Sequence, residues 1–259
     1  MYYNIGMNKF YAYRYVLYVL LILSISAYLI LLIYGYRINW QNFNVEKTSV
    51  IYVASIPQEV NVYINDRLVS DSTPLRNNYV FPGRYEVRIE HPLYEPWVKF
   101  FNVKPNIVSQ DPDVVLILRD KKNVLLEQSE VGAYKKMFED EKNIKKQSFG
   151  LSIKDNHELY FEDVFVTRFS QEIKNVVWFL DKKHILVQLD NVIYFMDSDA
   201  SNIKPLVALH GNNTANFLSV DDGKYLVYQY EDSVNKIQIT NISNLFREKY
   251  FNKAVKIIK

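Results

Sequence analysis

The chain has no cysteine among its 259 residues, which excludes thiol catalysis, cysteine-ligated metal sites and disulfide frameworks. A cysteine-free protein suits an oxidising exterior and a reducing interior equally, so the compartment stays open. Glycine and proline are scarce, at 7 and 8 residues, which excludes low-complexity stretches and flexible Gly/Ser linkers. The formal net charge of +2 is too small to indicate a nucleic-acid-binding protein.

Sequence motifs typical of catalysis, phosphate binding and metal binding are also missing. The sequence contains neither a G-x-S-x-G nucleophile motif nor a phosphate-cradling loop. A segment starting at Asp197 begins like a calcium loop, but Asn202 replaces the glycine at position six and Ala208 the acid at position twelve. The histidines lie far apart without metal-ligand spacing: His91, His157, His184 and His210. We therefore predict no catalytic residue, no metal site and no cofactor.

One long uncharged run stands out against this background. The 22 residues of segment 15–36, between Arg14 and Arg37, carry no charge. A helix rising about 1.5 Å per residue needs this length to cross a hydrocarbon core of roughly 30 Å. Because the run is apolar on every face, we predict a transmembrane helix over 15–36. Two rivals are a buried helix of a soluble protein and a cleaved signal peptide, for which Ser24 and Ser26 have suitable spacing.

The charges around this run favour one orientation. Lys9 and Arg14 precede it, and Arg37 and Lys47 follow it. The positive-inside rule then favours a cytoplasmic N-terminus over 1–14 and extracytoplasmic C-terminal domains in a single-pass protein of the cell membrane. Tyrosines flank both ends of the run, as expected for two membrane interfaces.

The remaining sequence favours strands. Aromatic residues make up 15% of the chain, with 21 Tyr and 15 Phe, and such residues prefer strands. Apolar and polar residues alternate with a period of two over 50–69 and again over 85–89. Asn65-Asp66 predicts a hairpin turn and Pro82-Gly83 a second turn. We predict a mainly β fold.

Three stretches in this region resemble the PEGA domain, a small β-sandwich module of bacterial and archaeal surface proteins. They are SIPQEVNVYINDRLV at 55–69, STPL at 72–75 and FPGRYEVRIEHPLYEPW at 81–97. Gln58-Glu59 and Leu93 replace glycines of the family pattern at turn positions. The resemblance implies a β-sandwich over 50–119 that binds or spaces surface components and carries no reaction.

Two residues of that resemblance are candidates for binding. Tyr94 and Trp97 belong to the closing Tyr-x-x-Trp of the pattern. Their rings either pack into the core or form a platform on which a carbohydrate stacks. Tyr94 and Trp97 are therefore the candidate binding surface that the sequence indicates.

A charged segment follows the PEGA-like region. Residues 120–147 are predicted to form a connector with one strand at 124–127.

A sequence repeat occupies the region after the connector, over 148–259. The stretch 181–187 aligns with 221–227, and an earlier partial copy ends at 158–161. Each full copy has three apolar strands, the third at 192–196 and 236–240. A period of about 40 residues is typical of propeller blades.

The two full copies are similar to blades of TolB-type propellers. Trp178 and Asp222-Gly223-Lys224 match the turn pattern of that family, whereas Lys183 stands where the first copy would carry glycine. About two and a half copies fit, and a closed ring needs at least about four. We therefore predict propeller-like blades that form no closed ring and leave an open edge near 236–240.

Together these patterns predict a membrane-anchored cell-envelope protein with a non-enzymatic binding or scaffolding role. Its expected partners are the lipid bilayer, through the helix, and envelope proteins, glycans or a second copy of the chain, but no nucleic acid. One alternative is an envelope-associated hydrolase whose site carries no familiar motif. The other is a purely structural spacer or oligomerisation protein.

Overall fold

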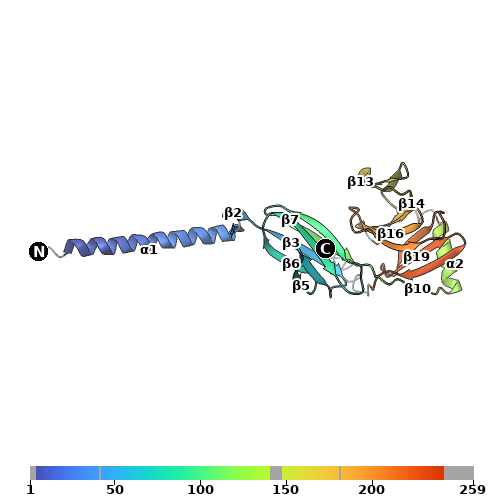
Figure 1. The fold of residues 1–259 in the computed structure, drawn as a ribbon, viewed down its shortest axis with the longest axis horizontal. Helices are drawn as coiled ribbons and strands as arrows, with labels where there is room; N and C mark the ends of the chain where they lie inside the picture. The colour runs from blue at the N-terminus through green and yellow to red at the C-terminus, as the bar shows by residue number, and fades with distance from the viewer. Residues whose placement is uncertain (1–3, 41, 141–147, 181, 242–259) are drawn as a thin grey trace, which may run out of the picture. The chain divides into compact units, whose positions relative to one another are not determined.

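The structure, a computed structural model, describes residues 4–40, 42–140, 148–180 and 182–241, with side chains from residue 13 onward. One long helix is followed by twenty strands and one short helix, so the described chain is mainly β, as predicted (Figure 1). The aligned Asp181 of the repeat and the last part of the range 148–259 lie outside the described residues.

The chain divides into two compact units, each made of segments far apart in sequence. Unit 1 comprises 1–53, 75–85 and 100–111. Unit 2 comprises 54–74, 86–99 and 112–259.

Helix α1 (Asn4–Ile33) contains the uncharged run. Its stretch Tyr13–Ile33 has a mean hydropathy of 2.8 with no part buried, so it is long and apolar enough to cross a membrane. The helix ends three residues before the predicted limit of 36. The cause is Gly35, whose φ of +81° is left-handed and whose N–H donates to the carbonyl of Leu32 at 3.1 Å.

A hairpin follows the helix at once, in a segment for which the sequence predicted no element. Strands β1 (Tyr36–Asn39) and β2 (Asn44–Lys47) pair antiparallel, with Tyr36 opposite Lys47. β1 also contacts α1. The hairpin therefore belongs to the base of the helix within unit 1.

Two sheets cover the segment that resembles the PEGA domain. One has the order β6-β3-β9, and the other β5-β4-β7-β8. Their strands are β3 (Ser49–Ile56), β4 (Asn61–Ile64), β5 (Arg67–Ser70), β6 (Leu75–Val80), β7 (Gly83–Glu90), β8 (Trp97–Val103) and β9 (Val108–Val115).

The predicted turns and alternation in this segment are confirmed. Asn65 and Asp66 have φ of 48° and 61° and connect β4 to β5, because their short polar side chains tolerate the left-handed region. Val87 and Ile89 of β7 are fully buried, whereas the residues between and beside them are partly exposed. Strand β7 begins at Gly83, directly after Pro82.

Three further sheets follow in unit 2. Strands β11 (Leu151–Lys154), β12 (Glu158–Phe161) and β13 (Val164–Arg168) form the first. The second contains β14 (Ile173–Trp178), β15 (His184–Leu189), β16 (Val192–Asp197) and β17 (Lys204–Ala208). The third has the order β10-β20-β19-β18, from β10 (Lys122–Val124), β18 (Asn216–Val220), β19 (Tyr225–Tyr230) and β20 (Ser233–Gln238).

The edge predicted to be open is occupied. β10 pairs antiparallel with β20, with Asn123 opposite Ile237. The third sheet thus takes its fourth strand from the segment that the sequence described as a charged connector. The strand predicted at 124–127 lies at 122–124 instead, and it is followed by helix α2 (Gln128–Glu139), which the sequence analysis missed. A capping box of Glu127 and Glu130 starts this helix.

The three sheets stack through two apolar clusters, and the middle sheet is covered on both faces. One cluster joins it to the third sheet through Phe179, Leu186, Phe217 and Leu226. The other joins it to the first sheet through Leu159 and Trp178. Phe138 of α2 packs on Leu218 and Val227, on the third sheet. Side chains that a closed ring would cover are therefore covered by a compact stack, and the described residues form no closed barrel.

Candidate functional site

The two binding residues suggested by the sequence are buried. Tyr94 is 3% exposed and Trp97 is 2% exposed. Burial raises the pKa of the Tyr94 hydroxyl, and the Tyr94 backbone carbonyl accepts a hydrogen bond from Arg119 Nε at 2.8 Å. A platform for stacking a carbohydrate needs an exposed ring face, so the structure favours the packing role that the sequence also allowed.

Trp97 lies against the loop that the sequence compared with a calcium site, here called the 197–202 loop. The indole Nε1 donates to Asp197 Oδ2 at 3.0 Å. The next backbone N–H, of Val98, donates to Asn202 Oδ1 at 2.9 Å. Lys99 then forms an ion pair with Asp199, with 2.7 Å between Nζ and Oδ2. Three successive residues at the start of β8 are thus held by one loop, a hundred residues away in sequence.

The loop directs its own side chains towards the same carboxylates. Asn202 Nδ2 and Ser201 Oγ donate to Asp197 Oδ2 at 2.9 and 3.2 Å, and the backbone N–H of Ser201 donates to Asp199 Oδ1 at 3.1 Å. Left-handed φ values of 61° at Ala200 and 53° at Asn202 fold the loop back on itself. Its acids hold β8, and nowhere in the described residues do three or more His, Asp or Glu gather as they would around a metal.

Electrostatics at this contact favour the ionised acid. Burial by itself raises the pKa of Asp199, but the hydrogen bonds from Lys99 and Ser201 outweigh it and hold that pKa below its ordinary value. The carboxylate that pairs with Lys99 is therefore charged at neutral pH.

One histidine approaches this loop. His184 Nε2 lies 3.8 Å from Asp197 Oδ1, and both side chains are buried. The imidazole stacks on Phe195, with 5.3 Å between ring centres. The buried carboxylate of Asp197 therefore lies between the imidazole of His184 and the indole N–H of Trp97.

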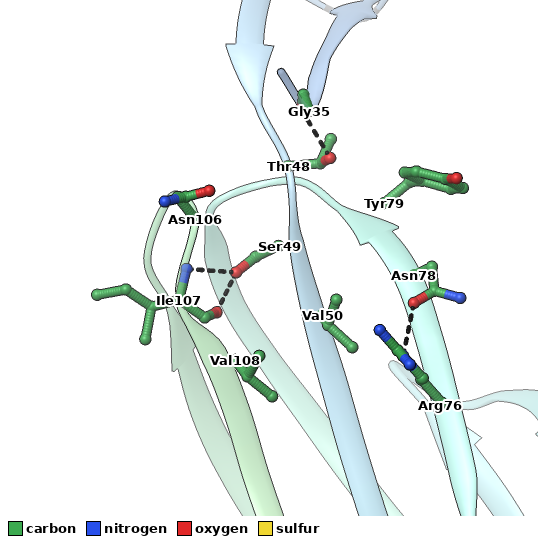
Figure 2. A pocket seen from close by; sticks show the side chains of 10 residues that line it. All are labelled: Gly35, Thr48, Ser49, Val50, Arg76, Asn78, Tyr79, Asn106, Ile107 and Val108. Atoms are coloured by element: carbon green, nitrogen blue, oxygen red, sulfur yellow. Dashed lines mark hydrogen bonds between the residues drawn. The ribbon is translucent and has the colours of Figure 1, made fainter. Parts of the chain in front are cut away.

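Unit 1 contains a separate hollow of about 510 Å³ beside the end of α1, here called the helix-end hollow (Figure 2). Its wall comes from the helix exit, the starts of β3 and β9, and the end of β6. The lining residues are Gly35, Thr48, Ser49, Val50, Arg76, Asn78, Tyr79, Asn106, Ile107 and Val108.

Hydrogen bonds hold this wall together. The backbone N–H and the hydroxyl of Thr48 both donate to the Gly35 carbonyl, at 2.9 and 3.0 Å. Ser49 Oγ accepts from the Ile107 backbone N–H at 3.2 Å, and Arg76 Nε donates to Asn78 Oδ1 at 3.1 Å. Figure 2 shows the bonds of the Thr48 hydroxyl, the Ile107 N–H and Arg76 Nε as dashed lines.

Tyr79 is placed at the hollow by a bulge. The register between β3 and β6 shifts so that Ser49 lies opposite Val80 and Val50 opposite Asn78, which leaves Tyr79 as the extra residue. Its φ of 61° is left-handed, an uncommon conformation for a bulky side chain. The Arg37 guanidinium lies 4.3 Å from the centre of its ring.

The sequence did not indicate the helix-end hollow, because its residues come from four segments with no common motif. One signal was available: Arg37 closes the uncharged run and so marks where the helix exits. The rest depends on strand pairing that composition and periodicity do not specify.

Comparison with curated proteins gives no match to this chain. Comparison with protein-family models gives one finding, which agrees with the strands, the Asn65-Asp66 turn and the buried closing Trp97 described above. Residues 48–110 match the PEGA domain.

Proposed function

We propose that this chain is a membrane-anchored cell-envelope protein whose β modules have a non-enzymatic binding or scaffolding role. The observation that carries the proposal is the position of the PEGA match. It begins at residue 48, and only the β1–β2 hairpin separates it from the apolar, unburied helix α1. A surface module that follows such a helix so closely is well placed to be held at a membrane.

The charges at the N-terminal end of the uncharged run support the proposed orientation. Lys9 and Arg14 precede segment 15–36, so the positive-inside rule favours a cytoplasmic N-terminus and β modules outside the cytoplasm. The protein is then a single-pass membrane protein with extracytoplasmic domains.

The stacked sheets of unit 2 support a blade-like, TolB-related arrangement. Two of them repeat the same meander about 40 residues apart, β14-β15-β16 and β18-β19-β20. Packing on both faces of the middle sheet is how blades and repeats bury their apolar faces.

A scaffolding role is supported by the contacts of the 197–202 loop. Trp97, inside the PEGA match, and Asp197, inside the stacked sheets, are both buried and hydrogen-bonded to each other. Buried polar pairs of this kind restrict the geometry of the elements that they join.

Crosslinking in native membranes tests this function. A photoreactive residue at Val164 or Phe165, which are 67% and 52% exposed on β13, should capture an envelope protein or a glycan. The same label at Leu159, which is fully buried, is the matched control and should capture nothing. Recovery of self-contacts alone would instead support the spacer or oligomerisation alternative. Absence of the chain from the membrane fraction would contradict the anchor.

A further inference from the structure

We propose that the helix-end hollow binds the phosphate headgroup of an anionic phospholipid from the membrane that holds α1. This inference rests on the membrane anchoring proposed above. It adds a lipid ligand and a defined site, and it gives unit 1 a role in holding the β modules against the bilayer surface.

Position is the first argument. Gly35 lines the hollow and is two residues beyond Ile33, the last residue of α1. Thr48 donates two hydrogen bonds to the Gly35 carbonyl, which fixes the hollow to the helix exit. Where an apolar helix leaves the hydrocarbon core, the next layer is the headgroup region. The hollow therefore opens at the depth of lipid phosphates.

Charge is the second argument. After α1, the sequence of unit 1 has five basic residues, Arg37, Lys47, Arg76, Arg84 and Lys104, against the acids Glu46 and Asp111. Arg76 lines the hollow directly. A guanidinium presents donors in a planar fork that matches the oxygens of a phosphate group.

The third argument is the contact between Arg37 and Tyr79, which lines the hollow. Arg37 Nη1 donates to the carbonyl of Tyr36 at 3.3 Å and to that of Leu32, in the last turn of α1, at 3.4 Å. Tyr79, held in a left-handed bulge, is 60% exposed below that guanidinium. Strained residues persist where the surroundings fix them, and they gather at ligand sites. Here the strain presents an aromatic ring and a cation together.

Exposed apolar side chains of unit 1 are the fourth argument. Ile107 and Val108 of the hollow are 53% and 52% exposed. In the β1–β2 hairpin that joins α1 to the hollow, Trp40 and Phe43 are 72% and 81% exposed. Exposed apolar side chains of this kind suit an interaction surface. Its mixture of aromatic and basic residues fits a lipid interface, where amphipathic rings sit at headgroup level.

The test uses the full chain in nanodiscs of equimolar phosphatidylcholine and phosphatidylglycerol. Native mass spectrometry after release from the disc measures which lipid stays bound. The wild type should retain phosphatidylglycerol in preference to phosphatidylcholine. Asn78→Asp keeps the side-chain shape but places an acid where Arg76 Nε donates, and Arg76→Gln removes the cation. Each should lower that preference roughly tenfold, the size of one charge-assisted hydrogen bond.

Arg67→Gln is the matched control, because it removes an exposed cation from β5 in unit 2 and should leave lipid retention unchanged. Circular dichroism of each variant checks that the fold is kept. Equal retention of the two lipids by the wild type, or the same preference in all variants, would overturn the inference while leaving the anchor intact. A chain that fails to enter the nanodisc would overturn both. A photoreactive residue at Tyr79 should label lipid; labelling of a protein in native membranes instead would also overturn it.

Discussion

Trp97 shows how one side chain can join distant parts of a chain. Its indole fills a buried position, and its N–H reaches a buried carboxylate, so packing and hydrogen bonding act through the same residue. The sequence indicated that this tryptophan closes the PEGA pattern. It did not indicate Asp197 as the partner, because nothing in a sequence pairs residues a hundred positions apart.

Trp97→Phe should lower the free energy of unfolding. Phenylalanine keeps most of the ring but removes the donor, which leaves Asp197 Oδ2 with the amide of Asn202 and the hydroxyl of Ser201. We expect a loss of about 1–3 kcal/mol, the usual cost of removing one partner of a buried hydrogen bond. Urea unfolding of the full chain in detergent measures it. The exposed Trp40→Phe is the control, and equal stability of both variants would contradict the proposed bond.

Stability should also depend on pH through Asp199. Burial raises the pKa of Asp199, but the contacts with Lys99 and Ser201 lower it by more. The pKa in the folded chain therefore lies below the ordinary 3.8. The folded chain then binds fewer protons than the unfolded chain between the two values. This contribution to stability is complete above the unfolded pKa and is lost as pH falls through the folded pKa.

Thermal unfolding of the wild type and Asp199→Asn at pH 7 and at acidic pH checks this expectation. The difference in stability between the two proteins should be largest at neutral pH and should shrink as the pH falls below about 4, because the wild-type acid becomes protonated. A difference that grows on acidification would show that the ion pair with Lys99 does not act as described.

At the scale of elements, the sequence predicted those turns and strands that depend on neighbouring residues alone. The Asn65-Asp66 turn, the alternating strand β7 and the repeated strands of unit 2 follow from turn residues and periodicity. The β10–β20 pairing did not follow, because three residues in a charged segment give too short a pattern. Helix α2 was also not predicted. Its sequence is rich in charged residues, so the few apolar positions that pack on β18 and β19 gave no clear helical pattern.

The turn between β18 and β19 gives an element-scale prediction. Gly223 has φ of +84°, and an added Cβ would lie 2.5 Å from Phe179 Cζ and 2.6 Å from Leu180 Cδ1. Gly223→Ala should therefore destabilise the fold by roughly 2–4 kcal/mol, from backbone strain and overpacking together. Chemical denaturation measures the loss. No loss would mean that this turn relaxes without disturbing the apolar cluster around Phe179.

Gly132→Ala is the matched control, with the opposite sign. Gly132 lies inside α2, and no atom is within 4 Å of its added Cβ. Alanine should raise stability by about 0.5–1 kcal/mol, because it restricts the unfolded chain and favours helix. The two variants make the same chemical change, so their contrast isolates the effect of the environment.

At the scale of the molecule, the sequence predicted the apolar helix and the PEGA segment better than the sites that strand pairing assembles. The apolar helix and the PEGA match are read along one continuous stretch, 13–33 and 48–110. The helix-end hollow collects residues from Gly35 to Val108, and the 197–202 loop holds β8. Sites of this kind depend on which strands become neighbours, and periodicity alone does not decide that.

The last prediction concerns the orientation of the whole chain. With a tag at each end, protease added to intact cells should remove the C-terminal tag and spare the N-terminal one, because the positive-inside rule favours a cytoplasmic location for the end that carries Lys9 and Arg14. Replacing both by glutamine leaves Arg37 and Lys47 as the basic residues nearest the helix, so a fraction of the chains should invert. Arg67→Gln, far from the helix in sequence, is the control and should leave the orientation unchanged. A C-terminal tag that survives in intact wild-type cells but is cleaved after permeabilisation would place the β modules in the cytoplasm. The helix-end hollow would then face the inner leaflet, whose anionic lipids carry the same phosphate chemistry.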